Sequence, residues 1–171
     1  MKEFPNAVTL KGNPMTLVGN EVKVGDKAPD FTVVANDLSN VTFGNFKGKK
    51  IILSAVPSLD TPVCDIETRR FNEEAGKLGN GVTVLTISTD LPFAQKRWCG
   101  ASGVKNVQVL SDHRETSFGS NYGVLIKGLR ILARAIFVVD ANGVVQYKQV
   151  VKEIATEPDY SAVLEAVKNL K

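Results

Sequence analysis

The chain has 171 residues, a formal net charge of +3 and a hydrophobic content of 43%, which are typical values for a globular protein. Its positive charges are scattered, with no basic run of five or more residues, and this argues against a nucleic-acid-binding protein. The start lacks the apolar core of a secretory signal and no stretch approaches the roughly 20 apolar residues of a membrane span, so we expect one domain, residues 1–171, in the cytoplasm and away from membranes.

The predicted elements alternate between strands and helices. A hairpin comes first, with strands at Val8–Leu10 and Met15–Val18 around the turn at Gly12 and Asn13. Further strands are expected at residues 31–34, 41–43, 51–56, 82–89, 107–110, 136–139 and 144–151, and helices at 62–78, 90–100, near 118–122 and at 159–170. This order indicates an α/β fold with a mixed central sheet and helices on both of its faces.

A cysteine lies in the first turn of the helix that is predicted to begin at Pro62. A proline at the first helical position loses no hydrogen bond, and Asp60 or Thr61 can cap the helix start. The free backbone N–H groups there and the positive end of the helix dipole favour the thiolate form of Cys64. The apolar face predicted for this helix holds Val63, Ile66, Phe71, Ala75 and Leu78. Cys64 falls near that face, so we expect a partly shielded, reactive sulfur.

The second cysteine lies at the other end of a helix. Cys99 directly precedes Gly100, which we expect to end the helix that begins near Asp90. The negative end of the dipole opposes ionisation there, so Cys64 is predicted to be the nucleophile. Asp65 works against the thiolate because it places a negative charge beside the sulfur. Two cysteines in a cytoplasmic protein seldom form a permanent disulfide, whereas a transient, catalytic bridge is allowed.

Three segments of the sequence carry distinctive motifs, namely the spacing from Pro57 through Thr61 to Cys64, residues 90–100 and residues 132–135. Together they resemble peroxiredoxins, and in particular their thiol peroxidase subgroup. The spacing from Pro57 through Thr61 to Cys64 is similar to the active-site signature of the family. Residues 90–100, Asp-Leu-Pro-Phe-Ala-Gln-Lys-Arg-Trp-Cys-Gly, resemble the resolving-cysteine segment of the subgroup, and residues 132–135, Leu-Ala-Arg-Ala, resemble its active-site arginine strand. The likeness extends from Val8 to Tyr160 and covers nearly the whole chain.

This resemblance implies a thioredoxin-like fold with an added N-terminal β-hairpin. It also implies an enzyme that reduces hydrogen peroxide and organic hydroperoxides through a sulfenic acid on Cys64. Cys99 then traps that acid as an intramolecular disulfide, which thioredoxin reopens. In this scheme Arg134 stabilises the thiolate and the leaving oxygen, the Thr61 hydroxyl hydrogen-bonds near the sulfur, and Pro57 closes one wall of the pocket. Members of the subgroup are commonly homodimers, and we expect the same here.

Alternatives to these roles remain open at the level of sequence. Arg130, Arg69 or Arg70 could approach the sulfur instead of Arg134, and Arg134 could be a surface ion-pair partner. The Thr61 hydroxyl could be a plain helix cap, and Cys99 a shielded thiol beside Trp98. In a second reading of function, the chain is a redox-sensing binding protein that is switched by the Cys64–Cys99 disulfide.

The sequence does not indicate a metal site or a nucleotide-binding site. A structural zinc site usually needs four Cys or His ligands, and the chain has two cysteines and one histidine. His113 is expected to be a solvated loop residue rather than the base of a Cys-His hydrolase. No glycine-rich phosphate-binding fingerprint is present, so we expect no cofactor and no metal.

Overall fold

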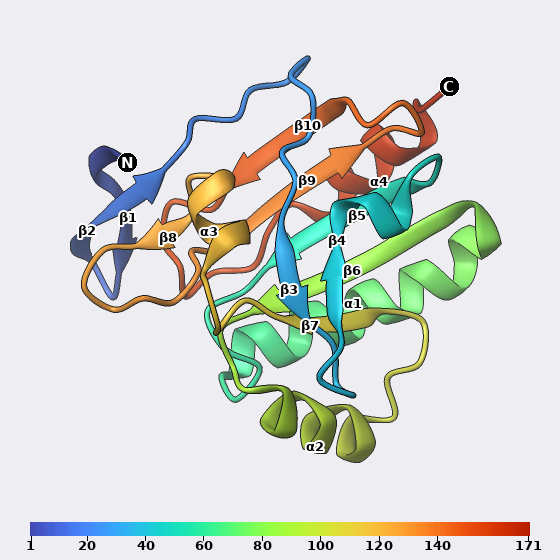
Figure 1. Ribbon diagram of the computed structural model, residues 1–171, viewed down its shortest axis with the longest axis horizontal. Helices are drawn as coiled ribbons and strands as arrows, with labels where there is room; N and C mark the ends of the chain where they lie inside the picture. Colours follow the sequence, from blue (N-terminus) through green and yellow to red (C-terminus); the bar gives the residue numbers. More distant parts are fainter.

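The computed structural model describes residues 1–171 and contains two β-sheets and four α-helices (Figure 1). The strands are β1 (Lys2–Leu10), β2 (Asn13–Gly19), β3 (Thr32–Val34), β4 (Asn40–Thr42), β5 (Lys50–Ala55), β6 (Val82–Ser88), β7 (Gln108–Ser111), β8 (Leu125–Ile126), β9 (Ala135–Val139) and β10 (Val145–Val150). The helices are α1 (Pro62–Leu78), α2 (Pro92–Ser102), α3 (Ser117–Asn121) and α4 (Tyr160–Lys168). Two short 3-10 turns, Phe43–Phe46 and Gly79–Gly81, complete the regular structure.

The larger sheet has seven strands in the order β10-β9-β5-β6-β7-β3-β4. β5, β6 and β7 run parallel, whereas β9 is antiparallel to β5 and β3 is antiparallel to β7. The parallel strands are connected by α1 and α2, as parallel pairs require a crossover. The predicted mixed sheet is therefore confirmed. β5, the third strand in this order, delivers the chain to the start of α1.

One face of this sheet is covered by the long helices. Side chains alternate along β5, so that Ile52 faces one side of the sheet while Ile51 and Leu53 face the other. Ile52 packs with Phe71 of α1 and Val163 of α4 in a buried cluster. Figure 1 shows α1 and α4 behind the sheet, in agreement with this packing.

The buried face of α1 is rotated from the face that the sequence predicted. Its buried side chains are Cys64, Glu67, Thr68, Phe71 and Ala75, which recur at the spacing of one helical face. Ile66, which we expected on the apolar face, is 49% exposed. That expectation was wrong because it counted apolar residues only, while two of the five buried positions are polar.

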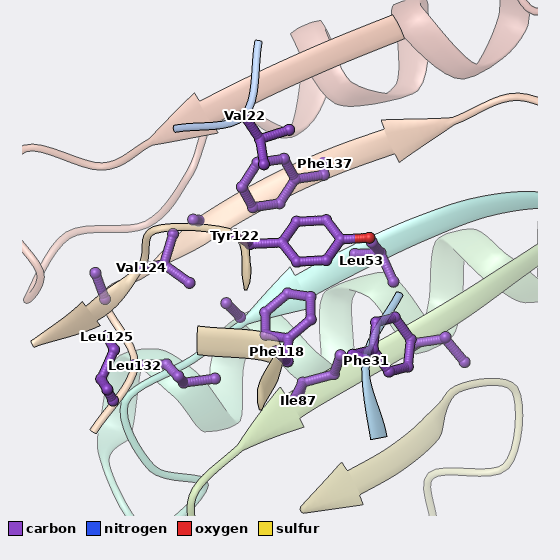
Figure 2. Close-up of a cluster of buried hydrophobic side chains, with 14 of the residues drawn as sticks. Val22, Phe31, Leu53, Ile87, Phe118, Tyr122, Val124, Leu125, Leu132 and Phe137 are labelled. Carbon is purple, nitrogen blue, oxygen red and sulfur yellow. The ribbon is translucent and has the colours of Figure 1, made fainter. Parts of the chain in front are cut away.

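The opposite face of the sheet carries an aromatic cluster under α3. The Tyr122 ring stacks on Phe118 with 4.5 Å between centroids and meets the edge of Phe137 at 5.0 Å. The ring centroids of Phe31 and Phe118 are 5.6 Å apart. Figure 2 shows these rings next to Leu53 and Ile87 of the sheet. Burying each ring contributes about 1.5–3 kcal/mol. Helices thus lie on both faces of the sheet, as predicted.

The N-terminal hairpin forms a second sheet of three strands in the order β1-β2-β8. Its two-residue turn is Lys11–Gly12, where both residues have positive φ angles of 51° and 80°, the conformation that suits a tight hairpin. The predicted hairpin is confirmed, with longer strands and with the turn one residue earlier. The two residues of β8 pair with Leu17 and Val18; they are too few to show a period, and the sequence did not predict them.

Helix α2 ends later than the sequence suggested. Gly100 was expected to end it, but the helix continues to Ser102 and is closed by Gly103, whose φ of 70° is left-handed. The Gly103 N–H donates to the carbonyl oxygen of Cys99 at 3.1 Å. Cys99 therefore lies in the last turn of α2. No helix of the protein is long and apolar enough to span a lipid bilayer.

Candidate active site

The turn between β5 and α1 places Cys64 at the base of the helix. The N–H of Val56 donates to the carbonyl of Ile87 on β6 at 2.9 Å, and Pro57, which follows, is buried. Thr61 then adopts an extended conformation as the N-cap residue, and Pro62 begins the helix. Since proline has no N–H, it occupies this first position without losing a hydrogen bond.

Asp90 fixes the shape of this turn. Its carboxylate accepts hydrogen bonds from Ser58 Oγ at 2.7 Å and from the Leu59 N–H at 2.8 Å, and also from Ser88 Oγ at 2.7 Å. The Thr61 hydroxyl donates to the Ser58 carbonyl at 2.7 Å. Thr61 is exposed and its side chain does not cap the helix, so its hydroxyl is tied to the preceding turn.

Arg134 lies against the sulfur of Cys64. Its Nη2 donates to Cys64 Sγ at 3.2 Å. Cys64 has no exposed surface and Arg134 is 2% exposed, so the contact is shielded from water. The sulfur is therefore more deeply buried than the sequence predicted. In such surroundings little solvent screens the permanent positive charge of the guanidinium from the sulfur.

The strand alternation explains why Arg134 points toward α1. Ile136 and Val138 of β9 pack in the same cluster as Phe71 of α1, and alternate residues of a strand share a face. Arg134 precedes Ile136 by two positions and so lies on that face. Ala135 pairs with Ala55 at the end of β5, which places Arg134 beside the turn that leads to Cys64.

Glu67 is a buried member of this site that the sequence analysis missed. Its Oε2 accepts from Arg134 Nη1 at 2.5 Å and its Oε1 from Ser54 Oγ at 2.8 Å, while Arg134 Nε donates to the Ile154 carbonyl at 2.9 Å. Together with the Cys64 sulfur, these partners contact the guanidinium on three sides. The available signal was the spacing, because Glu67 follows Cys64 by three residues and so shares its helix face.

The charges of this pair depend on each other. Burial raises the pKa of the Glu67 carboxyl, and the Arg134 charge and the Ser54 hydroxyl oppose that rise. Burial by itself lowers the pKa of Arg134, but the charges of Glu67 and Cys64 more than offset it, and the pKa rises. Since both Glu67 oxygens accept hydrogen bonds, the contacts are those of a carboxylate paired with a guanidinium.

The other arginines named from the sequence lie elsewhere. Arg130 is exposed and donates to Thr116 Oγ1 at 3.2 Å. Arg69 pairs with Asp65 at 2.9 Å, and Arg70 pairs with Glu74 at 3.2 Å. Arg134 is thus the arginine that the structure places on the sulfur.

Cys99 lies in different surroundings. It is half-buried in the last turn of α2 and opens onto a groove of about 470 Å³ that Asn36 also lines. Burial raises the pKa of the Cys99 thiol, and a hydrogen bond from Asn36 opposes the rise. Both cysteines are free thiols, and both border one small apolar cluster built on Val56, Leu59 and Val109.

His113 is tied into a polar network rather than solvated, contrary to expectation. It is half-buried, and its Nδ1 lies 2.8 Å from Ser111 Oγ, which donates to the Asp90 carbonyl. The His113 side chain is not part of the Cys64 site. No group of three or more His, Cys, Asp or Glu side chains is arranged to hold a metal ion.

The structure places a fully buried cysteine at a helix start against a buried arginine. The Redoxin family model matches residues 23–164. A thiol peroxidase of Halalkalibacterium halodurans is 60% identical over 162 residues, 95% of this chain and 97% of the relative. The chain belongs to the Redoxin family, among its thiol peroxidases.

Other Redoxin relatives agree in sequence and in fold. A thiol peroxidase of Bacillus subtilis is 58% identical over 163 residues, 95% of this chain and 97% of the relative. The crystal structure of a peroxiredoxin-like protein from Aquifex aeolicus, 49% identical, superposes with a TM-score of 0.91 and covers 97% of this chain and 98% of that one. A thiol peroxidase from Chromobacterium violaceum, 22% identical over 94% of both chains, shares the fold with a TM-score of 0.84. The thioredoxin-like fold is confirmed by these neighbours.

Proposed function

We propose that this thiol peroxidase reduces hydrogen peroxide and organic hydroperoxides at Cys64. The observation that carries the proposal is the 3.2 Å contact between Arg134 Nη2 and a Cys64 sulfur with no exposed surface. A thiolate is the nucleophilic form of cysteine, and a buried guanidinium stabilises it. The amides that open α1 support the same charge.

The reaction is a displacement at the O–O bond. The Cys64 thiolate attacks the terminal oxygen, an S–O bond forms, the O–O bond breaks, and hydroxide or alkoxide leaves and takes up a proton. Arg134 and the backbone N–H groups of the Thr61–Cys64 turn stabilise the negative charge that develops on the leaving oxygen. The product is water or an alcohol, with Cys64 as a sulfenic acid.

Thr61 and Pro57 shape the substrate side of the site. The Thr61 hydroxyl proton is already given to the Ser58 carbonyl, which leaves the oxygen lone pairs free to accept a hydrogen bond from the peroxide O–H. Buried Pro57 forms a wall that keeps water from the sulfur. Since Cys64 has no exposed surface, peroxide enters when the side chains around this turn move apart.

Cys99 completes the cycle as the resolving thiol. Its sulfur attacks the sulfenic sulfur of Cys64, an S–S bond replaces the S–O bond, and the hydroxide and the thiol proton leave together as water. Two thiols of thioredoxin then reduce the bridge, which returns both cysteines to thiols and leaves thioredoxin as its disulfide. Support comes from the shared apolar cluster, which both cysteines border.

A homodimer is part of the proposal. Both helices that carry the cysteines also carry exposed large apolar side chains, namely Ile66 on α1 and Phe93 on α2, which are 49% and 67% exposed. A second copy of the chain would shield such side chains from water. Sedimentation of the reduced protein at several concentrations measures the oligomeric state directly. A monomer at every concentration would contradict the homodimer.

The test of the activity is turnover coupled to thioredoxin, thioredoxin reductase and NADPH. We expect Cys64→Ser to abolish peroxide reduction, and Arg134→Lys to slow Cys64 oxidation by about 10²–10³-fold, because lysine cannot reproduce the fork of contacts. Cys99→Ser should allow one oxidation and then stall. One stoichiometric oxidation of the wild type without recycling would contradict the enzyme and favour the redox-sensing binding protein.

A further inference from the structure

Asp90 binds one end of a peptide group whose other end binds the Thr61 hydroxyl. The Leu59 N–H donates to Asp90 Oδ2 at 2.8 Å, and the Ser58 carbonyl oxygen accepts from Thr61 Oγ1 at 2.7 Å. This N–H and this carbonyl belong to the same Ser58–Leu59 peptide, which is planar and trans, so they point in opposite directions. The carboxylate and the hydroxyl are therefore connected through a single rigid group.

The turn that contains this peptide closes on the same carbonyl. The Thr61 N–H also donates to the Ser58 carbonyl oxygen, at 3.2 Å, so residues 58–61 form a four-residue turn. The Asp65 N–H then donates to the Thr61 carbonyl oxygen at 3.0 Å, as the first backbone bond of α1. A rotation of the Ser58–Leu59 peptide would remove the acceptor of the Thr61 hydroxyl proton.

Asp90 is itself held by the ends of two paired strands. Ser88, the last residue of β6, donates through its hydroxyl to Asp90 Oδ2 at 2.7 Å, and Ser111, the last residue of β7, donates to the Asp90 carbonyl oxygen. Ser88 and Ser111 are partners in the parallel pairing of these strands. Gln95 of α2, which has no exposed surface, donates to Ser88 Oγ at 3.0 Å. The carboxylate is thus presented to the turn from a fixed position.

The partners of Asp90 require an acceptor on both of its side-chain oxygens. The Ser58 hydroxyl, the Leu59 N–H and the Ser88 hydroxyl all donate to the carboxylate. An ionised carboxylate only accepts, whereas an asparagine amide would direct its NH₂ group at one of these donors. Hydrogen bonds to a charged group are about twice as strong as neutral ones. The bond at the peptide N–H also polarises the peptide and strengthens its carbonyl as an acceptor.

Two other carboxylates are close to this turn in sequence and make their contacts elsewhere. Asp65 on α1 accepts from the indole N–H of Trp98 at 3.0 Å, and exposed Asp60 lies 3.8 Å from Arg97. Asp90 is therefore the carboxylate that contacts the backbone of the turn.

We propose that Asp90 is a positioning residue of the peroxidase reaction, which acts through the Ser58–Leu59 peptide to keep the Thr61 hydroxyl oxygen available as an acceptor for the peroxide O–H. This inference rests on the proposed function. Because the Ser58 carbonyl takes the Thr61 proton, the hydroxyl oxygen faces the peroxide with its lone pairs. Without that carbonyl the hydroxyl proton turns to other acceptors, and the peroxide loses a partner that orients its O–O bond for attack by Cys64.

The experiment compares two reagents on the same sulfur. Reduced protein is mixed with hydrogen peroxide or with methyl methanethiosulfonate, a small thiolate reagent that has no N–H or O–H group to donate to Thr61. Samples are quenched in acid at intervals, and the loss of the free Cys64 thiol is followed by mass spectrometry of its peptide. In Asp90→Asn we expect the peroxide rate to fall by about 10–100-fold, the factor that a hydrogen bond to a charged group contributes. The rate with the second reagent, and its pH profile, should match those of the wild type.

A double-mutant cycle tests whether Asp90 acts through Thr61. Thr61→Val removes the hydroxyl and keeps the branched shape, so adding Asp90→Asn to it should slow the peroxide reaction no further. Asp140→Asn is the matched control, because the Asp140 carboxylate also accepts hydrogen bonds in a turn, from the Asn142 N–H at 2.9 Å and from Gln146 Nε2 at 2.7 Å, but at the opposite end of the sheet. Its peroxide rate should equal that of the wild type.

The outcomes separate the role of Asp90 from the activity on which it rests. Equal slowing with both reagents overturns the inference, because Asp90 would then only maintain the thiolate. A peroxide rate that is unchanged in Asp90→Asn, or effects that add in the cycle, also overturn it. If Asp90→Asn does not fold, Ser58→Ala, which removes one donor to the same carboxylate, must slow the peroxide reaction and not the second one. A wild type whose Cys64 does not react with peroxide, or a Thr61→Val variant that reacts as fast as the wild type, contradicts the proposed function, and the inference falls with it.

Discussion

At the scale of single residues, the site is built around a buried ion pair rather than around the sulfur alone. Arg134 and Glu67 are 2% and 0% exposed, and the guanidinium reaches Cys64, Glu67 and the Ile154 carbonyl together. Removing one member of a buried pair leaves an uncompensated charge, which is more harmful than removing both. Under the proposed function, the stability of the fold and the reactivity of Cys64 depend on the same arginine.

Arg134→Met is expected to lower the free energy of unfolding by about 3–5 kcal/mol, because Glu67 loses its partner in the interior. Adding Glu67→Gln should restore part of that loss, since the uncompensated carboxylate is gone. Urea unfolding at pH 7 measures both variants. Lys127→Met, which breaks the exposed ion pair with Glu3, serves as the control and should change stability by less than about 1 kcal/mol. A double variant that is less stable than Arg134→Met would contradict the explanation.

Cys99, the proposed resolving thiol, should show its own pH dependence. Burial raises the pKa of Cys99 and Asn36 opposes the rise, so near neutral pH only a small fraction is thiolate, and this fraction grows with pH. The rate of disulfide formation after a peroxide pulse should therefore increase without a plateau up to at least about pH 8.5, the ordinary thiol value. Asn36→Ala removes the opposing hydrogen bond and should slow this step several-fold at pH 7. A rate of disulfide formation that levels off below pH 8 would contradict the raised pKa of Cys99.

Reasoning from the residues alone could reach the local part of the site, and the family resemblance supplied Arg134 from its long-range part. Pro57, Thr61 and Cys64 lie within eight consecutive residues, and the chemistry of a helix start is local. Choosing Arg134 over Arg130 required knowing which face of β9 meets α1, and a shift of one residue in a strand reverses the face. Glu67 was missed because the apolar pattern was placed on Val63 and Ile66, although a glutamate on a buried helix face indicates a partner.

At the scale of elements, the N-terminal hairpin supports the arginine from behind. The Thr9 N–H donates to the Lys152 carbonyl at 2.7 Å, and the Ile154 N–H donates to the Thr9 carbonyl at 2.9 Å. The Ile154 carbonyl in turn holds Arg134 Nε. The segment that orients the guanidinium is therefore itself held by β1. Short segments such as β8 could not be predicted, because two residues carry no period.

Glu153 fastens this junction, and the stability lost on removing its carboxylate should depend on pH. Its carboxylate accepts hydrogen bonds from the Gly12 N–H at 3.0 Å and from the Thr9 hydroxyl at 2.8 Å, and these and other bonds lower its pKa from 4.5 to about 2. A lowered folded-state pKa stabilises the fold above pH 4.5, and this contribution disappears as the pH falls from 4.5 to about 2.

Glu153→Gln should therefore reduce stability at pH 7, and the difference from the wild type should shrink through that acid range. Thermal unfolding at a series of pH values measures it. Glu165→Gln, on the exposed side of α4, is the control. A difference that stays constant between pH 4.5 and pH 2 would show that the hydrogen bonds, and not the charge, are what matter.

At the scale of the whole molecule, a rigid sheet carries two cysteine-bearing helix ends. β5 is paired on both sides, with β6 and β9, and Ile52 and Leu53 in its centre have no exposed surface. The mixed sheet and the coverage of both its faces could be predicted from the succession of strands and helices, whereas the order of the strands within the sheet was not predicted. The end of α2 could not be predicted, because Gly100 and Gly103 offer the same stop signal and only packing decides between them.

Oxidation should loosen the helix ends and leave the sheet unchanged. After one equivalent of peroxide, we expect hydrogen exchange to accelerate in the first turn of α1 and the last turn of α2, while β5, β6 and β9 keep their protection. Oxidised Cys99→Ser, which cannot form the bridge, should keep its α2 amides protected. Loss of protection across the central strands would show that the bridge strains the whole fold.

Trp98 is the sole tryptophan of the chain, and its indole N–H is bound to a carboxylate one residue from Cys64. Indole emission shifts in wavelength and intensity when a neighbouring charge or the access of water changes. The protein therefore carries an optical reporter of its own redox cycle, with no dye attached. The fluorescence of Trp98 should change during each turnover and can be recorded in real time. Other proteins in the sample that lack tryptophan would not obscure this signal.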